Sequence, residues 1–400
     1  MFKEGFNVSW TQQGTVKGLL RGIISGTTLD EHTAVALELD GVRAAATSLV
    51  GDAVLDAIYV NIHTHLIPNG RHVIALQLER DGHSVRSAPS VVEVSNEGSL
   101  AVAVEKSMRD SGTPLVFLGQ CDSSAYDYSD VALKPWHERE PAQVEEHIRG
   151  LQDAGVVNDM EADALRSFSK NGFMVLEGLI PDVVVDRANR DMDEAIDSKY
   201  QGYEYGQSTR LEQMHVTFPG IRDIWLNKDV HRLLGAIFGT PSEPCQSLVY
   251  VFGSQQDAHQ DTIHLTPFPA GYMCGVWVAL EDVRDNSGEL VVYPGSHRLP
   301  RVYLKDEECA KVGGDWSEFG QKVVGRWSKM ISDARLERSV YKAKRGSVLI
   351  WHENLMHAGS VRIDKSLSRR SMVSHCFAQG SVVYYDSTGL VGSSTSLSSI

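Results

Sequence analysis

Short apolar runs separated by turn residues dominate the first hundred positions of the chain. The β-prone runs cover residues 35–41, 57–62, 72–78 and 91–94. The pairs Asp40-Gly41, Asn69-Gly70 and Asp81-Gly82 supply the turn chemistry that joins neighbouring strands. This pattern predicts a small antiparallel β-sandwich domain over residues 1–105.

Helical spacing replaces the strand pattern after residue 105 and leads into a second β-rich region. Residues 140–154 have helical periodicity with an acidic start, so residues 106–160 are predicted to be a linker with a helix. A helix from Ala162, a β-like run at 172–178 and a helix over 181–199 follow. Further strands are predicted at 247–252, 273–280, 289–293, 347–351 and 372–377. Residues 161–386 therefore form the second predicted domain, mainly β with flanking helices, and a Ser-rich tail covers residues 387–400.

Composition narrows the class of protein. At 400 residues the chain is long enough for two domains, and no stretch approaches the length of about 18 apolar residues that a membrane span needs. A net charge of −14 argues against nucleic acid as a partner. The N-terminus lacks the pattern of a secretory signal, and the cysteines occur singly. We expect a cytoplasmic protein without a membrane partner, and the sequence leaves the oligomeric state unknown.

Three residues of the second domain outline a metal site. His259 and Asp261 lie two apart in an extended segment, so both side chains project from the same face. His357 follows a strongly apolar strand whose end a barrel can place beside that pair. Two imidazoles and one carboxylate leave three positions open on an octahedral ion, which is the facial triad of non-haem Fe(II) oxygenases.

A longer series of motifs surrounds these residues. It runs His259-Gln-Asp261, Trp277-Val-Ala-Leu-Glu281, Ser287-Gly288, Pro294-Gly-Ser-His297, Gly346 and His357-Ala-Gly-Ser360. In order and spacing it resembles the phytanoyl-CoA dioxygenase (PhyH-like) family from about residue 165 to 380. The resemblance implies a double-stranded β-helix (jelly roll), Fe(II) held by His259, Asp261 and His357, 2-oxoglutarate as cosubstrate and O2. It also implies hydroxylation of a substrate C–H bond with release of succinate and CO2, and the presence of Asp261 favours hydroxylation over halogenation.

The resemblance also implies residues that bind 2-oxoglutarate. In the family, an arginine roughly eleven residues beyond the distal histidine pairs with the far carboxylate of the cosubstrate, for which a bidentate guanidinium is well suited. The candidates are Arg369 and Arg370, and strand alternation turns only one of them inward. The extra residue in His357-Ala-Gly-Ser360 shifts the match to Arg369. Trp277 matches a residue that lines the cosubstrate pocket, and Ser360 is a further candidate.

Other histidines are interpreted as structural. His63 and His65, with His72 nearby, have the spacing of a zinc site, but no Cys or acidic ligand accompanies them. His297 follows a Pro-Gly turn, and the spacing of His352 from His357 does not fit a shared extended face. These residues are left out of the predicted metal site.

Besides the function of an oxygenase, the sequence leaves two alternatives open. The chain could be a non-catalytic glycan-binding protein with a relic jelly roll, or a metal-dependent cupin-type isomerase. The runs Gly22-Ile-Ile-Ser-Gly26 and Asn69-Gly-Arg-His72 resemble those of small β domains attached to bacterial glycan-assembly enzymes. This resemblance favours a small-molecule or saccharide-containing substrate, and residues 203–222 and 301–340 are expected to cover the pocket.

Overall fold

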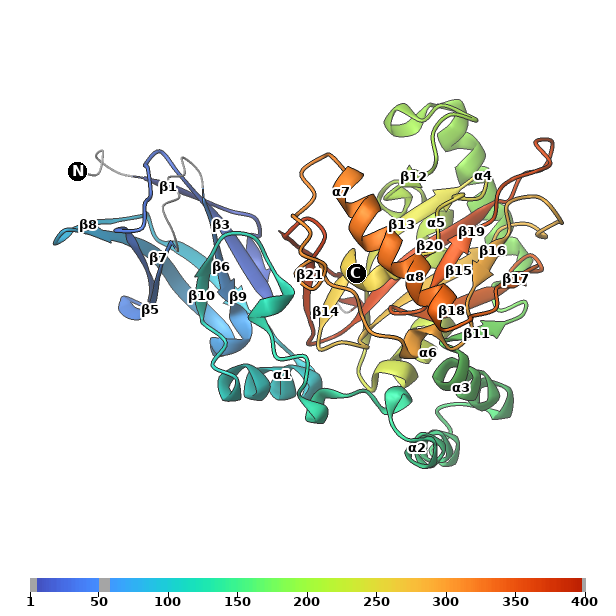
Figure 1. Ribbon diagram of the computed structural model, residues 1–400, viewed down its shortest axis with the longest axis horizontal. Coiled ribbons are helices and arrows are strands. Elements are labelled where there is room, and N and C mark those ends of the chain that lie inside the picture. The colour runs from blue at the N-terminus through green and yellow to red at the C-terminus, as the bar shows by residue number, and fades with distance from the viewer. Residues whose placement is uncertain (1–5, 50–57, 398–400) are drawn as a thin grey trace. The chain divides into compact units, whose positions relative to one another are not determined.

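The structure is a computed structural model that describes residues 6–49 and 58–397. The chain divides into two compact units, one of Met1–Leu133 with Gly380–Gly392 and one of Lys134–Gln379 with Ser393–Ile400 (Figure 1). Some positions of the predicted elements lie outside the described residues. They are Ala57 of a predicted strand, residues 1–5 at the N-terminus and the last three residues of the predicted tail. Within the described ranges, no helix combines the length and apolarity needed to cross a bilayer.

Two β-sheets make up most of the first unit. One sheet has the order β1-β3-β6-β10 and is antiparallel throughout. Its strands are β1 (Asn7–Trp10), β3 (Leu19–Ser25), β6 (Ile58–His63) and β10 (Val116–Leu118). The other has the order β2-β9-β7-β4-β5, with β8 beside β7. Its strands are β2 (Gly14–Val16), β4 (Ala34–Leu39), β5 (Val42–Ser48), β7 (Gly70–Arg80), β8 (His83–Arg86) and β9 (Ser90–Val94).

One apolar core joins these two sheets. Alternate residues such as Val35 and Leu37 of β4 are buried in one cluster with Val60 and Ile62 of β6. The predicted turn at Asp40-Gly41 has positive φ at both residues, 52° and 80°, as a tight hairpin connection requires. Strand β2 pairs with β9 in parallel, so the unit differs from the wholly antiparallel sandwich that was expected.

The boundaries of the first unit also differ from those expected at residues 105 and 386. Helix α1 (Gly98–Asp110) belongs to this unit, and so does the returning segment with β21 (Val382–Tyr385) and β22 (Leu390–Val391). The backbone of Gly380 packs directly against α1. A Cβ at position 380 would lie only 2.6 Å from the backbone nitrogen of Ala101. The ring of Tyr384 lies 5.5 Å from that of Tyr126. Contacts between segments so far apart in sequence leave no local pattern from which to predict them.

The second unit is mainly β. Its larger sheet has the order β11-β18-β15-β20-β13-β12, and a smaller sheet has the order β17-β16-β19. The larger sheet contains β11 (Phe173–Leu176), β12 (Leu211–Glu212), β13 (Ser242–Tyr250), β15 (Met273–Ala279), β18 (Val348–His352) and β20 (Ser371–Ala378). The smaller contains β16 (Leu290–Val292), β17 (Ser339–Tyr341) and β19 (His357–Gly359). Trp277 and Leu349 of the larger sheet share an apolar core with Leu290 and Val292 of the smaller, so the two sheets pack together.

Helices flank these sheets. They are α2 (Pro141–Asp153), α3 (Asp159–Asn171), α4 (Asp182–Asp197), α5 (Pro219–Trp225), α6 (Lys228–Phe238), α7 (Ser317–Phe319) and α8 (Gly325–Asp333). Helix α3 begins before the predicted Ala162 because Asn158 and Glu161 form a capping box. It ends at Asn171 and is capped by Gly172, whose φ is 85°. Residues of α7 and α8 pack with Ile263 and Met356, next to the predicted metal ligands, so part of the 301–340 segment lies beside that site.

Candidate metal centre

The structure brings His259, Asp261 and His357 together. His259 and His357 form an antiparallel bridge, in which each backbone N–H donates to the other carbonyl at 3.1 Å. The Oδ1 atom of Asp261 lies 3.5 Å from Nε2 of His259 and 3.7 Å from Nε2 of His357. All three side chains are buried. Three potential ligand atoms therefore face one point, although His357 lies almost 100 positions away from the other two residues in the sequence.

Hydrogen bonds select the ring nitrogen that each histidine presents. Nδ1 of His259 lies 2.8 Å from the carbonyl oxygen of Asp257, and Nδ1 of His357 lies 3.0 Å from that of Leu355. Because a carbonyl only accepts, each Nδ1 carries the proton and each Nε2 presents a lone pair toward Asp261. Burial lowers the pKa of His357 to about 4, which keeps this imidazole neutral at pH 7.

The carboxylate of Asp261 is held in its charged form. Burial alone would raise the pKa of Asp261, but the neighbouring His357, His259 and His375 outweigh burial and hold this pKa well below its usual value. Imidazole nitrogen and carboxylate oxygen are ligands that suit Fe(II). The donor set and its protonation therefore fit this metal.

Arg369 is a buried cation that forms no ion pair within 4.0 Å among the described residues, although the charges of Glu281 and Glu289 act on it. Its Nε donates to the carbonyl oxygen of Gly288 at 2.9 Å and its guanidinium donates to Oγ of Ser371 at 2.7 Å. Burial lowers its pKa to about 10, so it is still charged at pH 7. The centre of the Trp277 ring lies 5.5 Å from Cζ of Arg369. Nε1 of Trp277 is buried without a hydrogen-bond partner among the described residues. A buried cation and an unpaired donor together favour binding of an anion.

Arg370 and Ser360 have different surroundings. The guanidinium of Arg370 donates to Oδ1 of Asp193 at 2.7 Å, so its side chain contacts α4. It also lies 3.4 Å from Oδ1 of Asn189 on the same helix. Ser360 is half-buried just after β19, and its backbone N–H donates to the carbonyl oxygen of Glu289 at 2.8 Å. Strand alternation thus turns Arg369 inward and Arg370 toward a helix.

His264 lies beside the candidate centre without joining it. Its ring is 5.3 Å from that of Phe319 and 5.9 Å from that of Trp316, which is half-exposed. Burial lowers the pKa of His264 to about 4, so its ring is neutral at pH 7. The ring of Trp327 lies 6.3 Å from that of His264 and 5.8 Å from that of Phe319. Its Nε1 donates to the side-chain oxygen of Gln260 at 3.0 Å. This part of the 301–340 segment therefore forms an aromatic wall next to the metal ligands.

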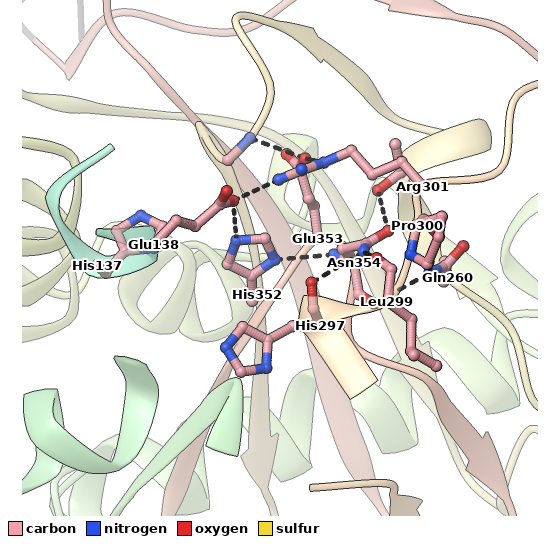
Figure 2. Close-up of polar contacts among 12 residues, drawn as sticks. His137, Glu138, Gln260, His297, Leu299, Pro300, Arg301, His352, Glu353 and Asn354 are labelled. Atoms are coloured by element: carbon pink, nitrogen blue, oxygen red, sulfur yellow. Dashed lines mark hydrogen bonds and ion pairs between the residues drawn. The ribbon is translucent and has the colours of Figure 1, made fainter. Parts of the chain in front are cut away.

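A second group of potential ligands comprises His137, Glu138 and His352. Nδ1 of His352 accepts the backbone N–H of Asn354 at 3.0 Å, so the ring proton sits on Nε2 and is donated to Glu138 at 3.0 Å. Glu138 also pairs with Arg301, as Figure 2 shows. The ring of His352 and the carboxylate of Glu138 are therefore engaged with each other and with Arg301, whereas Nε2 of His137 has no hydrogen-bond partner among the described residues.

The N-terminal histidines have structural partners. Nδ1 of His63 lies 2.7 Å from the carbonyl oxygen of Pro114, and its Nε2 lies 3.0 Å from the hydroxyl of Tyr126. Nε2 of His65 lies 2.8 Å from the carbonyl oxygen of Gly380. His72 contacts Asp40 at the surface. Tyr126, which contacts His63, is buried.

Low pH should destabilise the first unit through His63 and His65. Burial lowers both pKa values to about 4, whereas the unfolded chain binds these protons near pH 6.5. Stability is therefore complete above pH 6.5 and is lost as the pH falls toward 4. We expect a loss of roughly 2 kcal/mol for each histidine between pH 7 and pH 5, measured by urea unfolding.

A variant carrying His63→Gln and His65→Gln should lose this part of the pH dependence. His32→Gln is the matched control, because the side chain of His32 is exposed. An equal pH slope in wild type and the double variant would contradict the prediction.

Four residues near Asp261 were absent from the predicted site. Trp351 and His375 both contact its carboxylate, Gln246 contacts His375, and Gly275 lies between the two aromatic residues. The one available signal was His375, a polar ring inside the apolar run of β20. Cross-strand register, which the sequence does not reveal, decides that these side chains meet.

Comparisons with known proteins place the second unit in a family. The family model described as phytanoyl-CoA dioxygenase (PhyH) matches residues 168–372, just over half of the chain. No curated protein sequence matches the chain. Among solved structures, the non-heme alpha ketoglutarate dependent carbocyclase SnoK from nogalamycin biosynthesis is 17% identical, with a TM-score of 0.48 over 59% of this chain and 89% of that chain. EctD from S. alaskensis is 16% identical, with a TM-score of 0.45 over 59% of this chain and 84% of that chain. Likeness at this level says nothing about the substrate.

Proposed function

Because the chain belongs to the phytanoyl-CoA dioxygenase family, it is a non-haem iron enzyme dependent on 2-oxoglutarate, and we propose that it hydroxylates a C–H bond of a small molecule. Bound Fe(II), 2-oxoglutarate and O2 supply the oxidising chemistry, with succinate and CO2 as coproducts. The observation that carries the proposal is the convergence of two imidazole nitrogens and one carboxylate oxygen on a single point.

The residues assigned to Fe(II) are His259, Asp261 and His357. Support comes from the two Nε2 lone pairs, which the backbone carbonyls of Asp257 and Leu355 select by accepting the protons on Nδ1. All three side chains are buried, so little water reaches their free ligand atoms. Because Asp261 is a carboxylate rather than a small residue, no ligand position is vacated for a halide, which favours hydroxylation.

Arg369 is assigned to the far carboxylate of 2-oxoglutarate. Its charge is buried and forms no ion pair among the described residues, and the ring of Trp277, whose indole N–H is unpaired within the same residues, lies beside it. A carboxylate placed there would satisfy both groups, which accounts for the stability of an otherwise costly buried cation. Ser360 remains a further candidate for this pocket. The substrate is proposed to be a small molecule, with a saccharide-containing compound favoured by the resemblance of the first unit.

The proposal is tested by spectroscopy and product analysis. Anaerobic addition of Fe(II) and 2-oxoglutarate should produce the weak visible charge-transfer band of the chelate. Incubation with O2 and candidate substrates should then yield succinate and a product heavier by one oxygen atom. A protein that shows no band, and forms no succinate with any substrate, would overturn the proposed function.

Replacing Arg369 with alanine should raise the 2-oxoglutarate concentration needed for half-saturation by about 100-fold. The estimate follows from the loss of charged hydrogen bonds worth about 1.5–3 kcal/mol each. The measurement is a titration of the charge-transfer band. Arg370→Ala is the matched control and should change half-saturation by less than about threefold, since Arg370 contacts α4. A large effect of Arg370→Ala with a small effect of Arg369→Ala would reverse the assignment.

A further inference from the structure

The second carboxylate oxygen of Asp261 has its own pair of donors. The indole Nε1 of Trp351 donates to Oδ2 at 2.7 Å, and Nε2 of His375 lies 3.3 Å from the same atom. Gln246 lies 2.8 Å from Nδ1 of His375 through its side-chain nitrogen, which can only donate. The proton of His375 therefore sits on Nε2, and this ring also donates to Asp261.

These residues form one row across the larger sheet. Gly275 of β15 lies opposite Trp351 of β18 on one side and opposite His375 of β20 on the other. His375 in turn lies opposite Gln246 of β13. Residues paired in this way project from the same face of a sheet. Trp351 and His375 therefore flank Gly275 on that face, and both contact the carboxylate of Asp261.

Gly275 provides the space for this arrangement. A Cβ at position 275 would lie 2.1 Å from Cε2 of Trp351, which is far inside the normal contact distance. The indole therefore lies directly over the glycine, and any larger residue would displace it. Trp351 and His375 are both buried, so water does not compete for their N–H groups.

We propose that Trp351 and His375 are positioning residues that clamp Asp261, so that it binds the metal through Oδ1 alone. This inference rests on the proposed iron site. Oδ1 faces the imidazole nitrogens of His259 and His357, whereas Oδ2 is occupied by the two donors. A hydrogen-bond donor to a metal-binding side chain orients that side chain and tunes the metal site.

The clamp matters because of the number of coordination positions. Two imidazoles and one carboxylate oxygen leave three of six octahedral positions open. A chelating 2-oxo acid needs two of these, which leaves one for O2. A carboxylate bound through both oxygens would take that last position. The clamp therefore preserves the position on which the oxygenase reaction depends.

The test counts the water molecules on a metal probe. The full chain is loaded with Mn(II) alone, and water-proton relaxation gives the number of exchangeable waters bound to the ion. Wild type should retain about three waters. The double variant Trp351→Phe/His375→Phe should retain about two, because the released carboxylate can bind through both oxygens. Trp351→Phe alone removes the shorter hydrogen bond to Oδ2 and should give a water count between these two values. This single variant replaces the double variant in the test if the double variant does not fold.

Trp136→Phe is the matched control. Its indole is also buried and donates to the carbonyl oxygen of Ile237 at 2.8 Å, but it has no contact with Asp261. This variant should keep about three waters. An unchanged water count in the folded clamp variants would overturn the clamp while leaving the iron site intact. A wild-type chain that binds no Mn(II) would overturn both proposals.

Discussion

Replacing His357 with alanine should weaken Fe(II) binding by more than about 100-fold. The estimate is a lower bound, because loss of a residue that only supports a ligand already costs about 10- to 100-fold in affinity. His357 supplies one of only three proposed protein ligands, and its Nε2 lies 3.7 Å from Oδ1 of Asp261. Equilibrium dialysis of the anaerobic protein against Fe(II) measures the change.

His264→Ala is the control for this prediction. His264 is also a neutral histidine beside the centre, but it contacts Phe319 and Trp316 and is not assigned to the metal. Its removal should change Fe(II) affinity by less than about threefold, since no ligand is lost. Equal losses in the two variants would contradict the assignment of His357 as a ligand.

Replacing Arg301 with methionine should lower the free energy of unfolding by about 3–5 kcal/mol at pH 7, the usual cost of breaking a buried ion pair. Arg301 pairs with Glu138, and its Nε lies 2.8 Å from Oε1 of the fully buried Glu353 (Figure 2). Without Arg301, the carboxylate of Glu353 loses the charge that offsets its burial. Urea unfolding of the two proteins gives the difference.

The loss should become smaller as the pH falls from 7 to 5. Burial already raises the pKa of Glu353, and removal of Arg301 would raise this pKa further. A carboxyl group whose folded pKa lies above its unfolded value stabilises the fold as it takes up a proton, so low pH relieves the defect. Arg187→Met is the control, because its pair with Asp223 is exposed, and it should cost less than about 1 kcal/mol. A similar cost in both variants would contradict the prediction.

The network around Arg301 also supports the candidate metal centre. The backbone carbonyl of Glu353 accepts the N–H of Asp261 at 3.0 Å and that of Thr262 at 3.2 Å. The side-chain oxygen of Asn354 lies 3.4 Å from the hydroxyl of Thr262. The segment after β18 therefore fixes the turn that carries Asp261, which explains why a rigid buried network lies next to the ligands.

The sequence by itself determined the family of this protein, its metal and its cosubstrate. Ligand types at fixed spacing, together with the Trp277 and His297 motifs, predicted the phytanoyl-CoA dioxygenase family, and the family match confirms that prediction and its iron and 2-oxoglutarate. Strand periodicity predicted that the second region is mainly β. These features are readable because each depends on residues that are neighbours along the chain or on motifs whose order is preserved.

Only the tertiary structure decided which side chains meet. The sequence favoured Arg369 over Arg370 only through a one-residue shift of the motif. Their different surroundings follow from the alignment of the segment just before β20, where the N–H of Arg369 donates to Val251 and the carbonyl of Arg370 accepts from Leu280. The return of the segment at Gly380 to the first unit depends on a close approach to Ala101. The row of Trp351, Gly275 and His375 depends on the alignment of three strands. Such alignments are set by the packing of the whole sheet, so no local pattern of residues encodes them.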